Sequence, residues 1–545
     1  MTTQYGESAA PPVDVLVVGA GPSGAVVTHT AAAAGLTVMV LEQGDWVNPS
    51  DFPANHPEWE LLIQHDWAHD PNVRQLPSDY PVDVSESDMW PVMFNAVGGS
   101  SIYYGAEWPR LLPSDFRVKT LDGVADDWPI SYNDLKPYHD EVDAFIGVAG
   151  VDGDTAYPEG LTYPLPPNPI GKAGMKAAEA ANTLGWHWWP GTNAIASQKF
   201  KTLEQCGRWG TCEWGCPQGA KASFDLIYLP QAVQMGARVV TGARVRRVVT
   251  DENGRATGAE YIGRDSIVRF QPARAVVLCA NGIGTPRLLL MSASQRHPNG
   301  LANSSDVVGR NLMLHPNCTA FGFYDDGLDS WRGPAGQLIH SLQFYETDKS
   351  RGFVRGAKMH VLPTPGPLNA IEVLRGSDSF DELWGRNIHA AARMAQKGIL
   401  WAANTEDLPE PHNRVTLSPD LVDSDGLPAP KVQYRISDNT RTLLKWTVER
   451  MVELHKAAGA TRIVTQELWV DQPGHLLGTA RMGDDPRTSV VNSYGKAHDV
   501  DNLYIADGSI FVTSGSANPT CTISALALRV GKGIVDDFAG RKVAQ

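Results

Sequence analysis

Cysteine and positive charge are both scarce in this chain of 545 residues. Six cysteines are too few for a secreted disulfide scaffold of this length. Lysine and arginine number 46 against 61 aspartates and glutamates, which leaves a formal net charge of −15. This deficit argues against a nucleic-acid surface and against an anionic membrane as partner. The N-terminal segment MTTQYGESAAPP lacks the basic-then-apolar pattern of a signal peptide, so we expect a cytoplasmic protein.

Long stretches with few charges are also rare, and the almost uncharged one at residues 13–41 is long enough to span a bilayer. Glycines and a Thr-His-Thr segment at residues 28–30 interrupt it. A buried parallel strand followed by a crossover helix explains it better, because such a strand is a continuous apolar run. We therefore expect a soluble protein without a membrane partner. Its length predicts two or more domains.

The same stretch contains the pattern G-x-G-x-x-G, in the segment VVGAGPSG. The glycines follow the apolar run 13–18 and precede the alanine-rich segment 25–35. A second apolar run, 37–41, is followed directly by an acidic residue. Strand, glycine turn, helix, strand and acid is the order of a dinucleotide-binding βαβ unit.

Each residue of this motif has a predicted role. Gly19 allows the tight turn, Gly21 lets the backbone approach a pyrophosphate, and Gly24 lets the helix pack close to the strand. The helix N-terminus offers free N–H groups and a positive dipole end to the phosphates. Glu42 is placed to accept hydrogen bonds from a ribose diol.

Further along the chain, the sequence predicts a β-hairpin, an antiparallel sheet and a helix. Residues 244–262 predict a β-hairpin around an Asn-Gly turn, followed by a short strand and then by the buried run 275–279. Residues 320–440 alternate in polarity between turn signals, which predicts an antiparallel sheet in a second domain. Residues 442–458 have apolar residues at helical spacing.

Four segments together resemble the glucose–methanol–choline (GMC) oxidoreductases, a family of FAD enzymes that oxidise alcohols. They are the βαβ unit, the glycine-rich segment NAVGGSSIYYGAEWPR, the segment GIGTPRLLLMS and a C-terminal stretch from HLLGTARMG to NPTCTISALAL. The resemblance implies an α/β fold with a Rossmann-like FAD-binding domain built from both chain ends. It also implies an α+β substrate-binding domain with an antiparallel sheet.

On this basis we expect a discontinuous FAD-binding domain. Its first part is residues 1–320, with irregular insertions at 45–90 and 150–225. Residues 321–455 form the predicted substrate-binding domain, and residues 456–545 return to the FAD-binding domain.

The resemblance also implies which residues hold the cofactor. Those in the glycine-rich segment and in the C-terminal stretch are Gly98, Gly99, Ser100, Asp507, Gly508, Asn518 and Thr520. In fungal pyranose oxidases, a histidine of the glycine-rich segment bonds covalently to FAD. Tyr103 stands at the corresponding place here, so we expect FAD to be held non-covalently.

Two residues of the C-terminal stretch match the family's catalytic pair. Removing a hydride from an alcohol carbon becomes easier once the oxygen loses its proton, and a neutral imidazole suits that task. His475 matches the family's catalytic histidine and is the predicted general base. Asn518 matches the partner position, where an amide donates to the reacting oxygen without titrating.

The His–Asn pair resembles most the pyranose oxidases and bacterial glycoside 3-oxidases. We therefore expect oxidation of a secondary hydroxyl, at C2 or C3 of a sugar or glycoside, to a ketone, with dioxygen or a quinone reoxidising the flavin. A lyase that keeps FAD only as a structural element is an alternative within the family.

Cys206, Cys212 and Cys216 leave a further alternative open. Their C-x5-C-x3-C spacing is compatible with a 3Fe–4S cluster, as in flavin subunits of multi-subunit sugar dehydrogenases that pass electrons to a cytochrome. The simpler interpretation, which we favour, is a set of packed thiols in a loop, with no metal site.

Overall fold

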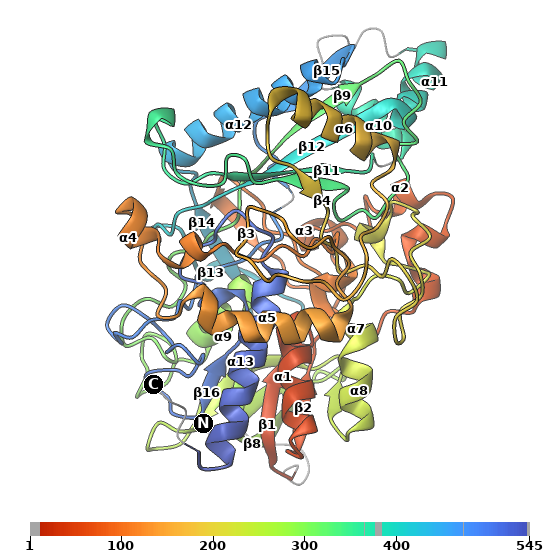
Figure 1. Cartoon of the computed structure of the whole chain (residues 1–545). Helices are drawn as coiled ribbons and strands as arrows, with labels where there is room; N and C mark the ends of the chain where they lie inside the picture. Colours follow the sequence, from red (N-terminus) through yellow and green to blue (C-terminus); the bar gives the residue numbers. More distant parts are fainter. Residues whose placement is uncertain (1–10, 365, 376–383, 472, 542–545) are drawn as a thin grey trace.

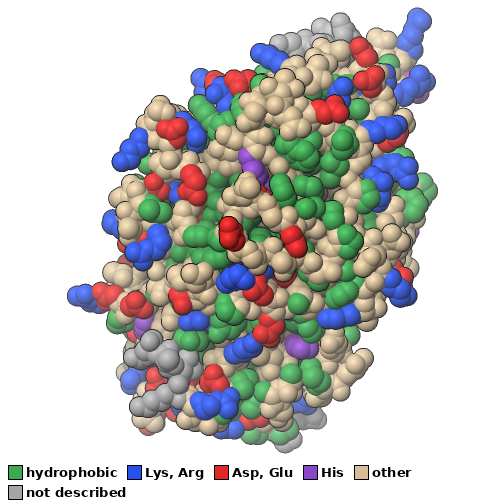
Figure 2. All heavy atoms as spheres, viewed as in Figure 1, with side chains coloured by type: hydrophobic (Ala, Val, Ile, Leu, Met, Phe, Trp, Pro, Cys, Tyr) green, Lys and Arg blue, Asp and Glu red, His purple; other side chains and the backbone are tan. Residues whose placement is uncertain are grey.

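The computed structural model describes residues 11–541 except residue 365, residues 376–383 and residue 472. Most of the N-terminal segment considered above lies outside these residues. In Figure 1 both chain ends lie at one end of the molecule, beside α1 and α13, and a second group of strands and helices forms the opposite end. Figure 2 shows acidic and basic side chains interspersed over one face of the molecule.

A seven-stranded sheet forms the end that holds both termini. Its order is β5-β2-β1-β8-β7-β6, and β16 pairs with β8. The pairs among β5, β2, β1, β8 and β16 are parallel, whereas β6, β7 and β8 form an antiparallel meander. The strands are β1 Val13–Val18, β2 Val38–Leu41, β5 Arg238–Val240, β6 Arg244–Thr250, β7 Ala256–Ile262, β8 Val268–Leu278 and β16 Leu503–Ile505.

This sheet confirms the predicted discontinuous Rossmann-like fold, because β1 and β16 from opposite chain ends share β8 as neighbour. The predicted hairpin is β6–β7. The sequence analysis expected a short strand and then a buried run after this hairpin. In the structure the two are one continuous strand, β8, whose residues 268–272 pair with β7 and whose residues 273–278 pair with β1. Helix α1 (Pro22–Ala33) packs on α13 (Thr520–Phe538), which packs on α5 (Tyr132–Ile146).

A six-stranded sheet of order β15-β9-β12-β11-β10-β4 forms the other end, and its pairs are antiparallel. Its helical cover is α12 (Asp438–Ala457), the predicted helix, and α6 (Gly171–Leu184). The strands are β4 Trp189–Pro190, β9 Asn317–Phe323, β10 Ile339–Ser341, β11 Ala357–Leu362, β12 Gly398–Thr405 and β15 Arg462–Gln466.

Alternation along β11 and β12 gives the six-stranded sheet two different faces. Met359, Val361 and Trp401 belong to the apolar core under the helices. Lys358 and His360, at the intervening positions of β11, face the other way. That second face closes over the seven-stranded sheet, and the site described below lies between them.

A separate three-stranded sheet is a correction to the sequence analysis, which placed residues 320–440 in one sheet. Here β13 (Arg414–Val422) and β14 (Pro428–Tyr434) form a hairpin whose outer neighbour is β3 (Asp83–Ser87), parallel to β14. Strand β3 comes from the segment 45–90, so its pairing is long-range and has no local signal in the sequence.

The edge strands β4 and β15 of the six-stranded sheet lie outside residues 321–455. The domain boundaries given above remain a prediction. Among the described residues, no helix carries an apolar stretch long enough to cross a bilayer. The remaining α-helices are α2 Trp59–Leu62, α3 Pro71–Arg74, α4 Val118–Asp122, α7 Phe224–Ile227, α8 Leu229–Gln234, α9 Asn281–Met291, α10 Pro367–Arg375 and α11 Arg386–Arg393.

Candidate active site

The carboxyl ends of the parallel strands meet at one edge of the seven-stranded sheet, where ligands bind in open α/β folds. A long cavity runs from this edge to the polar face of the six-stranded sheet. Of the residues predicted from sequence, those that line it are Gly19, Gly21, Glu42, Gly99, Ser100, His475, Asp507, Gly508, Asn518 and Thr520. Gly24 and Gly98 lie behind the lining.

The three glycines of the first motif differ in what surrounds them. Gly19 has φ +99°, and a Cβ there would lie 2.5 Å from the Cys279 carbonyl oxygen. A Cβ on Gly24 would lie 2.0 Å from the Gly19 carbonyl oxygen, so the helix rests directly on the turn. A Cβ on Gly21 would meet only the Gly99 Cα, at 3.9 Å. Gly21 therefore faces the cavity, whereas Gly19 and Gly24 are closed in by backbone.

Glu42 is buried at the end of β2, and its carboxylate holds the glycine turn in place. One oxygen accepts from the Ala20 N–H at 2.8 Å and the other from the Gly44 N–H at 2.9 Å. Burial raises the pKa of Glu42, while these backbone donors lower it. The Gln43 backbone also acts on this carboxylate as a donor. A carboxylate has about four lone-pair sites, so these donors do not exhaust its acceptor capacity.

Asp507 stands at the end of β16, across the cavity from the glycine turn. Its carboxylate accepts from the Thr285 hydroxyl at 2.6 Å, and from the N–H and hydroxyl of Ser509 at 2.9 and 2.6 Å. These contacts tie the C-terminal stretch to α9, within the segment GIGTPRLLLMS. Burial raises the pKa of Asp507.

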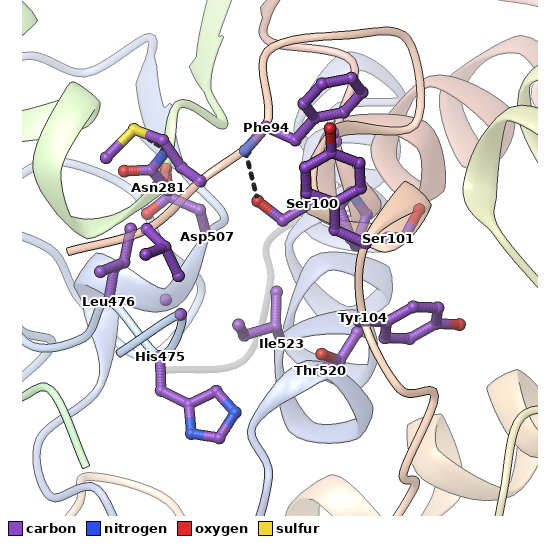
Figure 3. A pocket seen from close by; sticks show the side chains of 18 of the residues that line it. Phe94, Ser100, Ser101, Tyr104, Asn281, His475, Leu476, Asp507, Thr520 and Ile523 are labelled. Atoms are coloured by element: carbon purple, nitrogen blue, oxygen red, sulfur yellow. Dashed lines mark hydrogen bonds between the residues drawn. The ribbon is translucent and has the colours of Figure 1, made fainter. Parts of the chain in front are cut away.

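The predicted catalytic pair lies at one end of the cavity. In Figure 3 the His475 ring projects from the chain just before Leu476, below Ile523 and Thr520 at the start of α13. Asn518 lies two residues before the first residue of that helix and lines the same cavity. Asn281 and Asp507 lie on the opposite side of the view from Ser101 and Tyr104. The tertiary structure thus brings His475 and Asn518 together.

Asn518 is oriented by two donors from the six-stranded sheet. Its Oδ1 accepts from Lys358 Nζ at 2.6 Å and from Asn404 Nδ2 at 2.9 Å. Because the oxygen takes both donors, the amide nitrogen is the group left to donate toward the cavity. Among the described residues no hydrogen bond occupies that nitrogen.

Lys358 is completely buried and forms an ion pair with Glu107. His360 Nε2 lies 3.3 Å from the other Glu107 oxygen. Burial lowers the pKa of Lys358 and raises that of Glu107, and their mutual attraction opposes both shifts. A cation therefore sits directly behind the Asn518 amide.

His475 contacts a second histidine that the sequence analysis missed. The two Nδ1 atoms of His475 and His315 are 2.9 Å apart. Burial lowers the pKa of His475 well below its usual value, and the neighbouring His315 and Lys358 lower it further. Burial also lowers the pKa of His315, to about 4. Both imidazoles are therefore neutral near pH 7.

Polar residues of the six-stranded sheet complete the cavity, and sequence reasoning named none of them. They are Asn317, His360 and Asn404. Glu107 also lines the cavity. It lies inside the segment NAVGGSSIYYGAEWPR, so that motif could have pointed to it. Lys358 and His360 alternate with apolar residues in AKMHVL, and this polar face of a buried strand was the one clue to them.

Tyr103 and the cysteine loop border the site. Tyr103 lines the cavity and stacks on Phe94, with ring centroids 4.1 Å apart. Cys206, Cys212 and Cys216 are free thiols, and burial together with the neighbouring thiols raises the pKa of Cys212 to about 12. Among the described residues, no group of three or more His, Cys, Asp or Glu side chains is arranged to hold a metal ion.

Comparison with known proteins gives matches over nearly the whole chain. The GMC oxidoreductase family description matches residues 13–317 and 409–527. The chain is 42% identical over 535 residues to 2-methyl-1,2-propanediol dehydrogenase of Mycolicibacterium austroafricanum, covering 96% of each protein. It is 30% identical over 550 residues to the fructose dehydrogenase large subunit of Gluconobacter japonicus, covering 96% of this chain and 98% of that protein.

Among solved structures, pyridoxine 4-oxidase from Mesorbium loti aligns with a TM-score of 0.64. The alignment covers 96% of this chain and 99% of that one, at 18% identity. At that identity the likeness concerns the fold alone.

Proposed function

The chain belongs to the GMC oxidoreductase family, and from this premise we propose that it oxidises a hydroxyl group of a polyhydroxylated small molecule to a carbonyl, with FAD as cofactor. The observation that carries the proposal is that His475 and Asn518 line the same cavity as Gly19 and Gly21 of the glycine turn. The predicted membership of an alcohol-oxidising enzyme family is confirmed by the family match.

The residues present fit FAD. Gly21 offers a backbone cradle that a Cβ would narrow, and Gly99 from the second glycine segment touches it. The N-terminal ends of α1 and α13 both line the cavity. Their positive dipole ends would favour negative charge on a bound cofactor, such as that of a pyrophosphate. Glu42 keeps acceptor capacity for a ribose diol. Tyr103 in place of a histidine supports non-covalent binding.

The chain's own part in the reaction is proton transfer and orientation. We assign His475 as the general base: its neutral imidazole takes the proton of the substrate hydroxyl, and the low pKa of the buried ring keeps it neutral in the resting enzyme. FAD, when bound, would supply the hydride acceptor. The H–C–OH group of the substrate thus loses a proton from its oxygen and a hydride from its carbon and becomes a carbonyl.

Asn518 orients and polarises the reacting oxygen. Lys358 and Asn404 fix the amide so that its nitrogen donates toward the substrate. The buried Lys358 cation also stabilises the alkoxide character that develops when the proton leaves, since charges interact strongly away from water.

For the substrate we propose a secondary hydroxyl, at C2 or C3, of a sugar or glycoside. The polar lining from the six-stranded sheet supports a substrate with several hydroxyls, and the relationship to a fructose dehydrogenase subunit supports a sugar. The second candidate is a small 1,2-diol, which the relationship to 2-methyl-1,2-propanediol dehydrogenase favours. Dioxygen or a quinone is the proposed final acceptor.

An anaerobic screen of the purified yellow holoenzyme tests this function. Monosaccharides, glycosides and 1,2-diols are mixed in turn with the enzyme, and bleaching of the flavin absorbance is followed. We expect rapid bleaching by one of these classes, and the class that bleaches decides between sugar and diol. Absence of bleaching by every hydroxyl compound would favour the lyase alternative, and about three irons per chain would favour the multi-subunit dehydrogenase.

A further inference from the structure

The segments that carry His315 and His475 meet at a single antiparallel bridge. Its residues are Met313 and Leu477, and the N–H···O distances are 3.1 Å in both directions. His315 lies two residues after Met313, and His475 lies two residues before Leu477. Because the two chains are antiparallel, both histidines lie on the same side of the bridge, and their ring centroids are 5.0 Å apart.

Backbone strain accompanies this placement. His315 has φ +49°, in the left-handed region that bulky residues seldom adopt. Such strain persists when surrounding contacts enforce it, and it gathers at functional sites. The neighbouring Leu314 N–H donates to Asp407 Oδ2 at 2.9 Å, which is one of the contacts that hold the segment. In this conformation the His315 ring packs against the His475 ring. His475 lines the cavity, and His315 lies behind it.

The outer nitrogen of His315 has one protonation state compatible with its neighbours. Nε2 lies 2.6 Å from the Gly515 carbonyl oxygen and 3.2 Å from that of Ser514. Carbonyl oxygens accept and do not donate, so Nε2 carries the hydrogen. An unprotonated Nε2 would set its lone pair against two oxygens.

The hydrogen positions on the two facing Nδ1 atoms follow from this assignment. His315 is neutral near pH 7, because burial lowers its pKa to about 4, so its one hydrogen is on Nε2 and its Nδ1 is an acceptor. The 2.9 Å contact between the two Nδ1 atoms therefore requires the hydrogen on Nδ1 of His475. A neutral His475 with hydrogen on Nδ1 has a bare Nε2.

We propose that His315 is a positioning residue that fixes His475 in the tautomer whose Nε2 is unprotonated, so that Nε2 receives the substrate proton. This inference rests on the proposed role of His475 as base. The two ring planes are 88° apart, and the facing Nδ1 atoms lie at hydrogen-bond distance. Lys358 and His360, the other titratable groups acting on the pair, come from β11 and leave these hydrogen positions unchanged.

Two substitutions at His315 separate this role from a merely structural one. In His315→Gln, the side-chain oxygen replaces Nδ1 as acceptor and the amide N–H₂ replaces Nε2–H as donor. In His315→Leu, a side chain of comparable size offers neither group. We expect the Leu variant to lose about 100-fold in the anaerobic rate of flavin reduction with FAD still bound, and the Gln variant to stay within about 5-fold of the parent enzyme.

Equal impairment of the folded Gln and Leu variants, or a parent-like rate in the Leu variant, would overturn the proposal. His475→Ala run in parallel keeps the two ideas apart. If His475→Ala reduces its flavin normally, the base assignment itself fails. If His475→Ala is inactive while His315→Leu is normal, the positioning role alone fails.

A direct measurement on the unmutated holoenzyme guards against folding failure of the variants. After labelling with ¹⁵N-histidine, the His475 signals are identified by their loss in His475→Gln. We expect a protonated, pyrrole-type Nδ1 and an unprotonated, pyridine-type Nε2 at pH 7. The reverse assignment would overturn the proposal whatever the kinetics show.

Discussion

The two ends of the cavity are built on different principles. The end proposed to hold FAD, which we call the dinucleotide end, is made largely of backbone from one continuous segment, in which Gly19, Gly21 and Glu42 lie within 24 residues of one another. The end proposed for catalysis, which we call the catalytic end, is made of side chains from strands and loops far apart in the chain, including Glu107, Lys358 and His475. A local backbone turn can be recognised from spacing alone, whereas a side-chain cluster depends on which strands become neighbours.

The two ends also differ in how they treat charge. Glu42 is stabilised by two backbone N–H groups. At the catalytic end an ion pair and two neutral histidines are buried together, and each protonation state depends on its neighbours. The first arrangement tolerates changes elsewhere in the molecule, whereas the second is sensitive to the loss of any one member.

The largest expected effect comes from removing the base at the catalytic end. His475→Ala is expected to slow anaerobic flavin reduction by about 10²–10⁴-fold, because general base catalysis contributes that much. FAD occupancy, measured by absorbance after desalting, should stay unchanged. Loss of FAD from this variant would contradict the prediction, because it would show that the catalytic end also holds the cofactor.

The buried ion pair provides the next effect. Lys358→Met leaves the Glu107 carboxylate buried without its cation, which is expected to lower the free energy of unfolding by about 3–5 kcal/mol. The matched control is Lys358→Met combined with Glu107→Gln, which removes both charges and should recover much of the loss. Chemical denaturation of the three proteins measures this, and an equally unstable double variant would contradict it.

Two substitutions compare glycines within the dinucleotide end. Gly24→Ala should destabilise the fold, because its Cβ would lie 2.0 Å from a backbone oxygen of the turn. Gly21→Ala should leave the apoprotein about as stable as the parent and weaken FAD retention, because its Cβ points into open cavity. Thermal unfolding and FAD occupancy after dialysis are the measurements. Equal instability of the two apoproteins would show that Gly21 is also packed.

The smallest effect is a shift in pH dependence. Burial, His315 and Lys358 lower the pKa of His475 well below its usual value. Since the neutral form is active, the flavin reduction rate should stay level as pH falls from 8 to about 6 and drop only below that. Because the pKa of His475 is lowered, its ring stays neutral and active to a lower pH than an ordinary histidine ring would. An acidic limb centred above about pH 6.5 would show that the ring is not desolvated as the structure has it.

Much of the fold could be predicted from the sequence where its signals are local. The apolar run of β1, the glycine turn, the hairpin β6–β7 and helix α12 each follow from spacing within a short window. The third sheet could not be predicted, because β3 and β14 are more than 300 residues apart and nothing in either marks the other as its partner. The continuous β8 was divided in error, since its polar first half resembles a separate strand.

The candidate site divides in the same way. Residues in recognisable motifs, such as Gly21 and His475, were named from the sequence and line the cavity. His315 and Lys358 were not named, because a lone histidine or lysine among apolar residues resembles any buried polar side chain. Their significance depends on a register and on a sheet face, and both are long-range features.

By itself, the sequence determined that a dinucleotide turn forms near the N-terminus and that an imidazole and an amide recur in the family's order near the C-terminus. Only the tertiary structure decided which groups surround that imidazole, and so where its hydrogen lies. The reason is physical: a turn is specified by the conformational freedom of adjacent residues, whereas a protonation state is specified by burial and by neighbouring groups that can come from anywhere in the chain.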